Sequence, residues 1–342
     1  MKTTGRTYLG QTHECAECHD HKYDPVSQKE YYQLFAIFNN IPHLGKGYNT
    51  HGPRMAFGPE KIDIPVMREL ATPRETRILI RGNFKTPGPT VEPALPGFLP
   101  GAEAGESRLD RLDFAQWLVR EDHPLTARVA VNYLWQHFFG QGLVPTSADF
   151  GIQGEKPSHP ALLDWLAREL IESGWDRKHL IRLITSSRTY QRSGQRGTEA
   201  EADPQNRFLA RMPRDRFSAE EIRDHSLAMA GQLVAHIGGP SVFPTQPAGY
   251  YEELGQNTAG NSNFTWADST GPGLFRKSIY TYWKRMALHP SLAAFDAPTR
   301  QFCVNRRNIT NTPQQALTLL NDPLFHTLAE ALGLRLQREP AL

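Results

Sequence analysis

The sequence predicts a mainly α-helical fold, an irregular multi-helix arrangement with long loops and one or two small strand pairs. Apolar residues recur every three or four positions through much of the second half of the chain, and Ser, Thr, Asp or Pro stands near the start of these stretches. Long segments rich in Gly and Pro lie between them, and one run, Thr76–Arg81, has the composition of a strand. The 342 residues suit one large domain or two to three smaller ones.

The first helix is predicted from Ser27 to about Asn39. Ser27 and Glu30 form a capping-box pattern, in which each side chain satisfies a backbone N–H at the helix start. An aromatic stripe at i, i+4 and i+7 predicts its buried face: Tyr31, Phe35 and Phe38. The many Gly and Pro residues of the segment 41–107 predict loops around the single strand.

After residue 106 the pattern becomes helical. Helix starts are predicted at Ser107, Asp122, Ser158, Asp176, Ser218 and Thr312. Ser218 with Glu221 repeats the capping box, and its helix is expected to reach about His236. The run Asn321-Asp322-Pro323 predicts a break and a restart, whereas residues 275–288 suit either a helix or a strand.

Charge and hydropathy exclude several classes of protein. The 38 basic and 36 acidic residues nearly balance, which argues against a nucleic-acid partner. No run of about 18 apolar residues exists, so no membrane span is predicted. The first ten residues are polar and lack the apolar core of a secretory signal peptide.

The most informative motif is Cys15-Ala16-Glu17-Cys18-His19, a C-x-x-C-H sequence. This is the pattern by which haem is attached covalently in c-type cytochromes, where two thiols bond to the two vinyl groups of the porphyrin. The histidine beside the second thiol then ligates the iron. The motif predicts haem c held by Cys15 and Cys18, with His19 as an axial ligand. Because such attachment belongs to the bacterial periplasm or an equivalent space, we expect the chain to be a fragment of a longer exported protein, without its signal peptide.

The same cysteines allow other interpretations. Cys15 and Cys18 could form half of a zinc site, completed by His21 and by Cys303 folding back from the distant part of the chain. They could also be a structural or redox-active pair. A sixth iron ligand is not determined by the sequence, and the better candidates near the motif are His51 and Met55.

Several stretches resemble known families. CAECHDHKYDPVSQKEYYQLFAIF resembles the end of the planctomycete-specific cytochrome-like domain, PSCyt, and RFSAEEIRDHSLAMAGQL and FDAPTRQFCVNRRNITNTPQQALTLLNDPLF resemble the planctomycete-specific domain, PSD. Both are domains of unknown function that occur in large exported bacterial proteins. The resemblance implies a C-terminal PSCyt remnant over 1–45, a loop-rich connector over 46–105 and a helical PSD-like domain over 106–342 that is truncated at its C-terminus.

Two hypotheses of function follow. The first is a c-type cytochrome-like protein of the periplasm or cell surface, with electron transfer or another haem-linked redox role and an unidentified redox partner. The second is a cell-surface or carbohydrate-related binding protein whose cysteines are structural or bind zinc, with Trp266, Tyr250 and Tyr251 stacking on a surface polysaccharide. The sequence has no G-x-S-x-G, H-E-x-x-H or P-loop motif, so no enzymatic activity is assigned.

Overall fold

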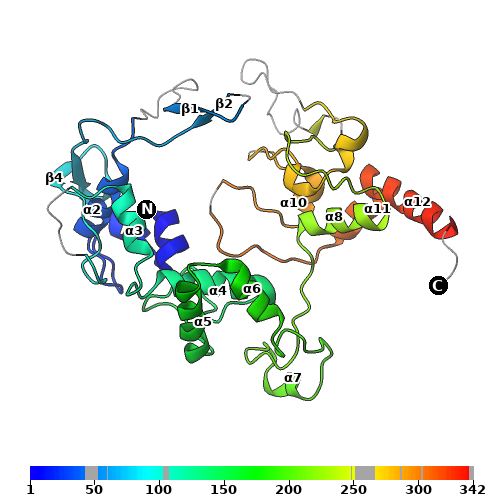
Figure 1. The fold of residues 1–342 in the computed structure, drawn as a ribbon, viewed down its shortest axis with the longest axis horizontal. Helices are drawn as coiled ribbons and strands as arrows, with labels where there is room; N and C mark the ends of the chain where they lie inside the picture. The colour runs from blue at the N-terminus through cyan, green and yellow to red at the C-terminus, as the bar shows by residue number, and fades with distance from the viewer. Residues whose placement is uncertain are drawn as a thin grey trace. The chain divides into compact units, whose positions relative to one another are not determined.

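The computed structural model describes residues 1–42, 53–59, 61–102, 108–247, 249–250, 266–285, 287–301 and 303–338. Over these residues the fold is mainly α-helical with two small antiparallel strand pairs, as the sequence predicts (Figure 1). The chain forms two compact units, Met1–Pro213 (unit 1) and Arg214–Leu342 (unit 2). No described helix is both long and apolar enough to cross a membrane.

Unit 1 contains both strand pairs and the first seven helices of the described chain. The helices are α1 (Lys2–Thr4), α2 (Gln28–Phe38), α3 (Arg111–Leu118), α4 (Thr126–Phe139), α5 (Pro160–Glu172), α6 (Arg177–Thr185) and α7 (Glu199–Ala202). Shorter helical turns are η1 (Gly5–Leu9), η2 (His13–Glu17) and η3 (Ile80–Gly82). The strands are β1 (Arg54–Phe57), β2 (Ile62–Pro65), β3 (Thr76–Leu79) and β4 (Pro87–Val91).

Helix α2 begins and ends close to where the sequence predicts. The Ser27 hydroxyl accepts from the backbone N–H of Glu30 (3.2 Å), and the Glu30 carboxylate accepts from that of Ser27 (2.9 Å), which confirms the capping box. The predicted buried face is wrong, because Phe35 is exposed and the buried residues are Tyr32, Leu34, Ala36 and Ile37. The helix packs against η2, the β3–β4 pair and α3, so these neighbours decide which face is buried.

The start of α4 differs from the prediction at Asp122. The Asp122 carboxylate accepts two hydrogen bonds from Arg120, each of 2.8 Å, and does not cap the helix. Instead His123 Nδ1 accepts from the backbone N–H of Thr126 (3.2 Å). The histidine is 4% exposed, and burial lowers its pKa to about 4. The buried imidazole of His123 therefore accepts the backbone N–H at the start of α4, the role predicted for the Asp122 carboxylate.

The main core of unit 1 lies between α4, α5 and α6. Helix α5 begins with Pro160 in its first turn, as predicted, but the residue before it is His159 rather than Ser158. The predicted cap of α6 by Asp176 is confirmed. The buried members of this core include Trp135, Phe139, Leu163, Leu166, Leu170, Leu180 and Ile184.

Asn132 joins α4 to the loop that follows it. Its side chain is fully buried, donates to the carbonyl of Val144 (3.0 Å) and accepts from the N–H of the same residue (2.8 Å). The amide thus satisfies one backbone donor and one backbone acceptor in the interior. It holds the loop that leads to residues 146–152 against the helix.

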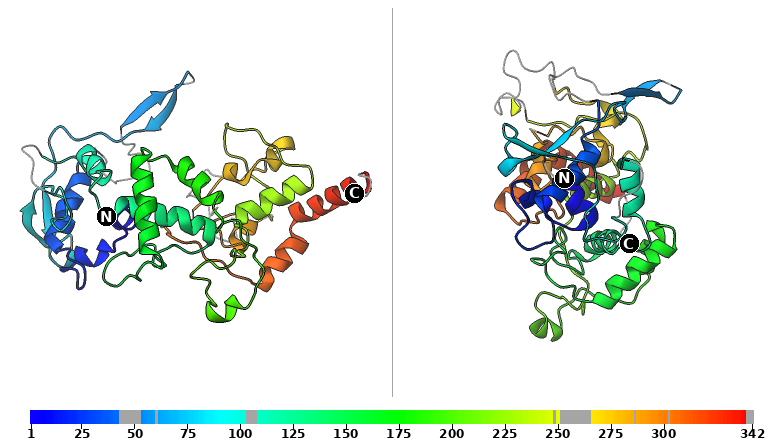
Figure 2. Two further views of the ribbon diagram at one scale, coloured as in Figure 1. Left: turned by 60° about the horizontal axis from the view of Figure 1, so that its bottom comes forward. Right: turned by 90° about the vertical axis from the view of Figure 1, so that its left-hand side faces the viewer.

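The predicted strand is shorter than expected. Strand β3 pairs with β4 in antiparallel register from Thr76 opposite Val91, but Ile80 and Arg81 leave the strand and turn. Gly82 has a φ of 69°, a conformation that favours glycine. The other pair, β1 and β2, forms a hairpin that projects from unit 1 (Figure 2).

Unit 2 is built on four helices, α8 (Ala219–Met229), α10 (Pro290–Ala294), α11 (Pro313–Asn321) and α12 (Pro323–Arg338), among its described residues. The capping box at Ser218 is confirmed, α11 begins directly after Thr312 as predicted, and Asp322 separates α11 from α12 as predicted. Helix α8 ends earlier than the predicted His236, because Gly231 adopts a φ of 69° and the chain turns. The core contains Ala219, Leu288, Leu292, Phe295 and Phe325.

The predicted segment 275–288 is neither a regular helix nor a strand. It contains the last residue of the turn η4 (Gly271–Phe275) and all of the turn η5 (Ser278–Tyr280), and two isolated bridges pair Val234 with Arg276 and Val242 with Thr281. Its main chain is held partly by Arg223, which donates to the carbonyls of Leu274 (2.7 Å) and Arg276 (2.8 Å).

We expect Asn132→Ala to destabilise unit 1 by about 2–3 kcal/mol, because the buried N–H and C=O of Val144 lose their partners. Urea unfolding followed by circular dichroism measures this loss. Gln116→Ala, on the exposed side of α3, is the control and is expected to stay within about 0.5 kcal/mol of the parent chain. Equal unfolding midpoints for the two variants would contradict the role given to Asn132.

We expect the stability of unit 1 to fall as the pH falls from about 6.5 towards 4. Burial lowers the pKa of His123 to about 4, so in this range the unfolded chain binds a proton that the folded chain excludes. The contribution of His123 is therefore complete above its unfolded pKa and decreases as the pH falls. Urea midpoints at pH 7 and pH 5 test this, and His123→Asn should show a smaller difference between the two pH values. An unchanged difference in that variant would refute the assignment.

Candidate functional site

The C-x-x-C-H motif lies on a single helical turn in unit 1. The backbone N–H groups of Cys18 and His19 both point to the carbonyl oxygen of Cys15, at 3.3 and 3.4 Å. Residues three and four positions apart on a helical turn lie on the same face, so this turn places the two cysteines and the histidine together. Cys15, Cys18 and His19 are exposed, whereas Ala16 between them is fully buried. The chemically active side chains therefore face outward on a turn anchored by its buried alanine.

The ring of His19 is oriented by its neighbour. His19 Nδ1 lies 2.7 Å from the carbonyl oxygen of Asp20, and because a carbonyl only accepts, Nδ1 carries the proton. This leaves Nε2 with an unshared electron pair. Histidines that ligate metals commonly donate their other ring N–H to a carbonyl in this way, which sets the tautomer and the direction of the ring.

Helix α2 holds the motif through two side chains and one backbone N–H. The Gln28 amide donates to the carbonyl of Glu17 (3.0 Å), and the Tyr32 hydroxyl donates to the same carbonyl (3.0 Å). The backbone N–H of Gln28 donates to the Asp20 carboxylate (2.7 Å). Burial and the nearby Glu17 carboxylate raise the pKa of Tyr31, so this half-buried phenol keeps its proton. The capped start of α2 is thus the platform on which the motif lies.

Gly82, from the η3 turn, touches the second thiol. A Cβ atom at this position would lie 2.7 Å from Cys18 Sγ, closer than real Cβ contacts come. The Gln28 amide that binds Glu17 also donates to the carbonyl of Leu79 (3.1 Å), which fixes the end of β3 beside the motif. Sequence reasoning did not include Gly82, although the Arg-Gly-Asn run at 81–83 is a turn signal.

Two histidines near the motif point inward. His13 is 2% exposed, its Nε2 lies 2.9 Å from the side-chain oxygen of Gln11, and burial lowers its pKa to about 4. The side chain of His21 is 3% exposed, and its Nδ1 accepts from the backbone N–H of Asp24 (2.9 Å). His21 therefore holds the turn after the motif, a structural role for a residue of the predicted zinc set.

The residues of the zinc interpretation are divided between the units. Cys15, Cys18 and His21 lie in unit 1, and Cys303 lies in unit 2, where it is exposed. Across the described parts of the chain, no group of three or more His, Cys, Asp or Glu side chains has a metal-binding arrangement. Met55 is exposed on β1, and His51 lies outside the described residues.

Two aromatic residues of the carbohydrate hypothesis, Tyr250 and Trp266, are half-buried in unit 2. The indole N–H of Trp266 donates to the carbonyl of Pro244 (3.0 Å), and its ring packs edge-on against Phe243 at 5.1 Å between centroids. The Tyr250 hydroxyl donates to the carbonyl of Leu288 (2.9 Å). Tyr251 lies outside the described residues. These contacts tie both described rings to the main chain of unit 2.

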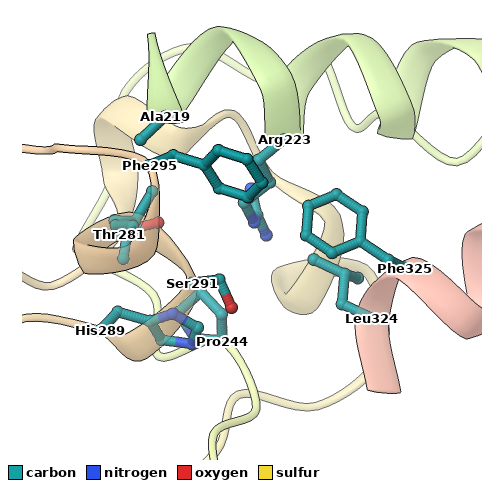
Figure 3. A pocket seen from close by; sticks show the side chains of 10 residues that line it. Ala219, Arg223, Pro244, Thr281, His289, Ser291, Phe295, Leu324 and Phe325 are labelled. Carbon is teal, nitrogen blue, oxygen red and sulfur yellow. The ribbon is translucent and has the colours of Figure 1, made fainter. Parts of the chain in front are cut away.

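Unit 2 also contains a small pocket bounded by α8, α10 and α12 (Figure 3). Arg223 and His289 line it, but Arg223 binds main-chain carbonyls and His289 Nε2 lies 3.0 Å from the carbonyl oxygen of Thr245. The volume open to the centre of a water molecule is about 10 Å³. That is room for about one water, so the pocket is too small for a substrate.

Two family models match the chain. PSCyt2, a protein of unknown function (DUF1549), matches residues 1–43, and PSD1, a protein of unknown function (DUF1553), matches residues 110–341. The chain belongs to the PSD1 family. The PSD1 match begins at Asp110, which caps α3, and the PSCyt2 match contains the whole C-x-x-C-H motif and α2. No curated protein and no solved structure matches the chain.

The PSCyt2 segment and the first part of the PSD1 segment pack together within unit 1. The Tyr133 hydroxyl of the PSD1 segment donates to the carbonyl of Arg6 (2.8 Å). The backbone N–H of Phe150 donates to the carbonyl of Gly10 (2.6 Å). The backbone N–H of Ile152 donates to the buried Asp24 carboxylate (2.9 Å). The motif of one family therefore rests on a scaffold supplied by both.

We expect Gly82→Ala to destabilise unit 1 more than Gly58→Ala does. Both glycines have a φ close to 70°, so either change adds about 1–2 kcal/mol of backbone strain, but only the Cβ at position 82 meets another atom, Cys18 Sγ. Urea unfolding measures the two losses, and alkylation followed by mass spectrometry measures the reactivity of Cys18. Equal losses with unaltered Cys18 reactivity would mean that Gly82 does not pack on the thiol.

Proposed function

We propose that this chain is part of an exported c-type cytochrome-like protein, in which Cys15 and Cys18 hold haem c and His19 ligates its iron. One observation carries the proposal: a single turn presents both thiols and the histidine on one exposed face, with His19 Nε2 left able to bind a metal. The donor set suits the group, because two thiols and one imidazole at this spacing are what covalent haem attachment uses.

Covalent attachment of haem to the two thiols needs no oxidant. Each thiol would add across one vinyl double bond, so that a sulfur–carbon bond would form and the thiol hydrogen would be transferred to the neighbouring vinyl carbon. The exposed positions of Cys15 and Cys18 leave both sulfur atoms accessible to this addition. Gly82 supports the fit, because the absence of a Cβ there makes room beside Cys18 Sγ.

The bound group would supply a one-electron iron couple, and the residues of the chain would hold it in place. The Asp20 carbonyl orients His19, and Gln28 and Tyr32 fix the turn that carries the thiols. A rigidly held axial ligand helps to set the reduction potential of such an iron couple. We infer an electron-transfer or haem-linked redox role in the periplasm or at the cell surface, with a redox partner of unassigned identity.

The alternative hypothesis of a surface or carbohydrate-related protein has less support. Trp266 and Tyr250 are half-buried and bonded to main-chain carbonyls, which leaves little ring surface for stacking on a sugar. The inward-pointing His21 likewise gives little support to zinc at the motif.

We expect the protein, exported in a host with a haem-maturation system, to carry one haem that survives acid-acetone extraction. Cys15→Ala with Cys18→Ala should abolish this covalent haem, because both thioether bonds are lost. Cys303→Ala is the matched control and should keep it. His19→Ala should alter the Soret and visible bands of any haem that remains attached.

Metal analysis of the same preparations separates the hypotheses. A colourless, iron-free protein that contains zinc, and that loses the zinc in the Cys303→Ala variant, would overturn the haem proposal in favour of the zinc site. A protein with neither metal would leave the two cysteines as a structural or redox-active pair.

A further inference from the structure

The loop between β3 and β4, residues 80–86, is a rigid turn that we call the hairpin tip. The backbone N–H of Ile80 donates to the carbonyl of Thr86 (3.1 Å), and two further main-chain bonds link Asn83 to Ile80 (3.1 Å) and Thr86 to Asn83 (2.9 Å). Arg81 and Gly82 both have positive φ, at 54° and 69°. The cost of this conformation for Arg81 indicates that its neighbours hold the turn in place.

The hairpin tip lies directly on the attachment motif. Gly82 is against Cys18 Sγ, and the Gln28 amide bonds both to Glu17 of the motif and to Leu79 at the base of the tip. One side chain of α2 thus fixes the tip and the motif relative to each other. A group bonded to Cys18 Sγ would therefore lie beside the hairpin tip.

Two apolar side chains of the tip are exposed, beside the exposed Arg81 and Lys85, and Lys85 Nζ lies 5.9 Å from the centroid of the Phe84 ring. Phe84 is 77% exposed and Ile80 is 48% exposed. A single exposed apolar side chain needs no explanation, but here two stand on one rigid turn that touches the Cys18 thiol. An apolar ligand held at Cys18 would cover apolar surface that both side chains leave in water.

We propose that the hairpin tip is a wall of the haem site, with Ile80 and Phe84 packed against the porphyrin that Cys18 holds. This inference rests on the proposed function. The group that covers Ile80 and Phe84 is the haem itself, because a thioether at Cys18 would place the apolar macrocycle next to Gly82. The wall shields the iron from water and so favours its less charged, reduced form.

The test uses the exported, haem-loaded protein and two readouts, the reduction potential and the rate at which added cyanide binds the oxidised iron. Ile80→Ser with Phe84→Ser should lower the potential and speed cyanide binding, since both changes admit water and ligand. Phe84→Leu keeps the apolar surface and should stay close to the parent protein. Phe208→Ser, at a 67% exposed phenylalanine elsewhere in unit 1, is the matched control and should change neither readout.

The outcomes are distinguishable. A parent protein without covalent haem overturns both the proposed function and the wall. A haem-loaded double variant with the parent's potential and cyanide rate overturns the wall alone. A double variant that keeps its circular dichroism spectrum and attaches less haem than the Phe208→Ser control supports the wall.

Discussion

The buried carboxylate of Asp24 is the interaction on which the arrangement of unit 1 depends. A carboxylate in the interior needs hydrogen-bond donors, and the backbone N–H of Ile152 supplies one at 2.9 Å. Gly151 beside it has no side chain, and a Cβ there would overlap the carboxylate oxygen. Because Asp24 ends the turn that follows His19, this contact sets where the whole motif lies against the scaffold of α4 and its following loop.

That contact also explains why two families meet in one compact unit. The PSCyt2 match ends at residue 43, yet its segment contributes Arg6, Gly10 and Asp24 as partners for the PSD1 segment. Buried polar groups need hydrogen-bond partners. Separating the two segments would therefore leave these carbonyl and carboxylate groups without their donors. The scaffold beneath the motif is therefore a joint product of the two segments.

The motif itself combines a rigid base with an open face. Gln28 and Tyr32 hold the carbonyl of Glu17, the Asp20 carbonyl directs His19, and Gly82 bounds Cys18 on one side. A cofactor attached here would be held by a preorganised ligand and would meet Ile80 and Phe84 of the hairpin tip. The proposed redox role and the proposed wall both follow from this single arrangement.

Local signals in the sequence were enough to predict the fold class, the capping boxes at Ser27 and Ser218 and the helix start at Thr312, because each helix start depends on residues within one turn of the chain. Tertiary contacts decided that Phe35 faces outward, because they determine which side of α2 packs against its neighbours. They also placed Gly82, which is 64 residues beyond Cys18 in the sequence, against its sulfur. Periodicity reports which side chains share a face, but which face is buried, and which distant glycine meets a thiol, depends on neighbours that only folding brings together.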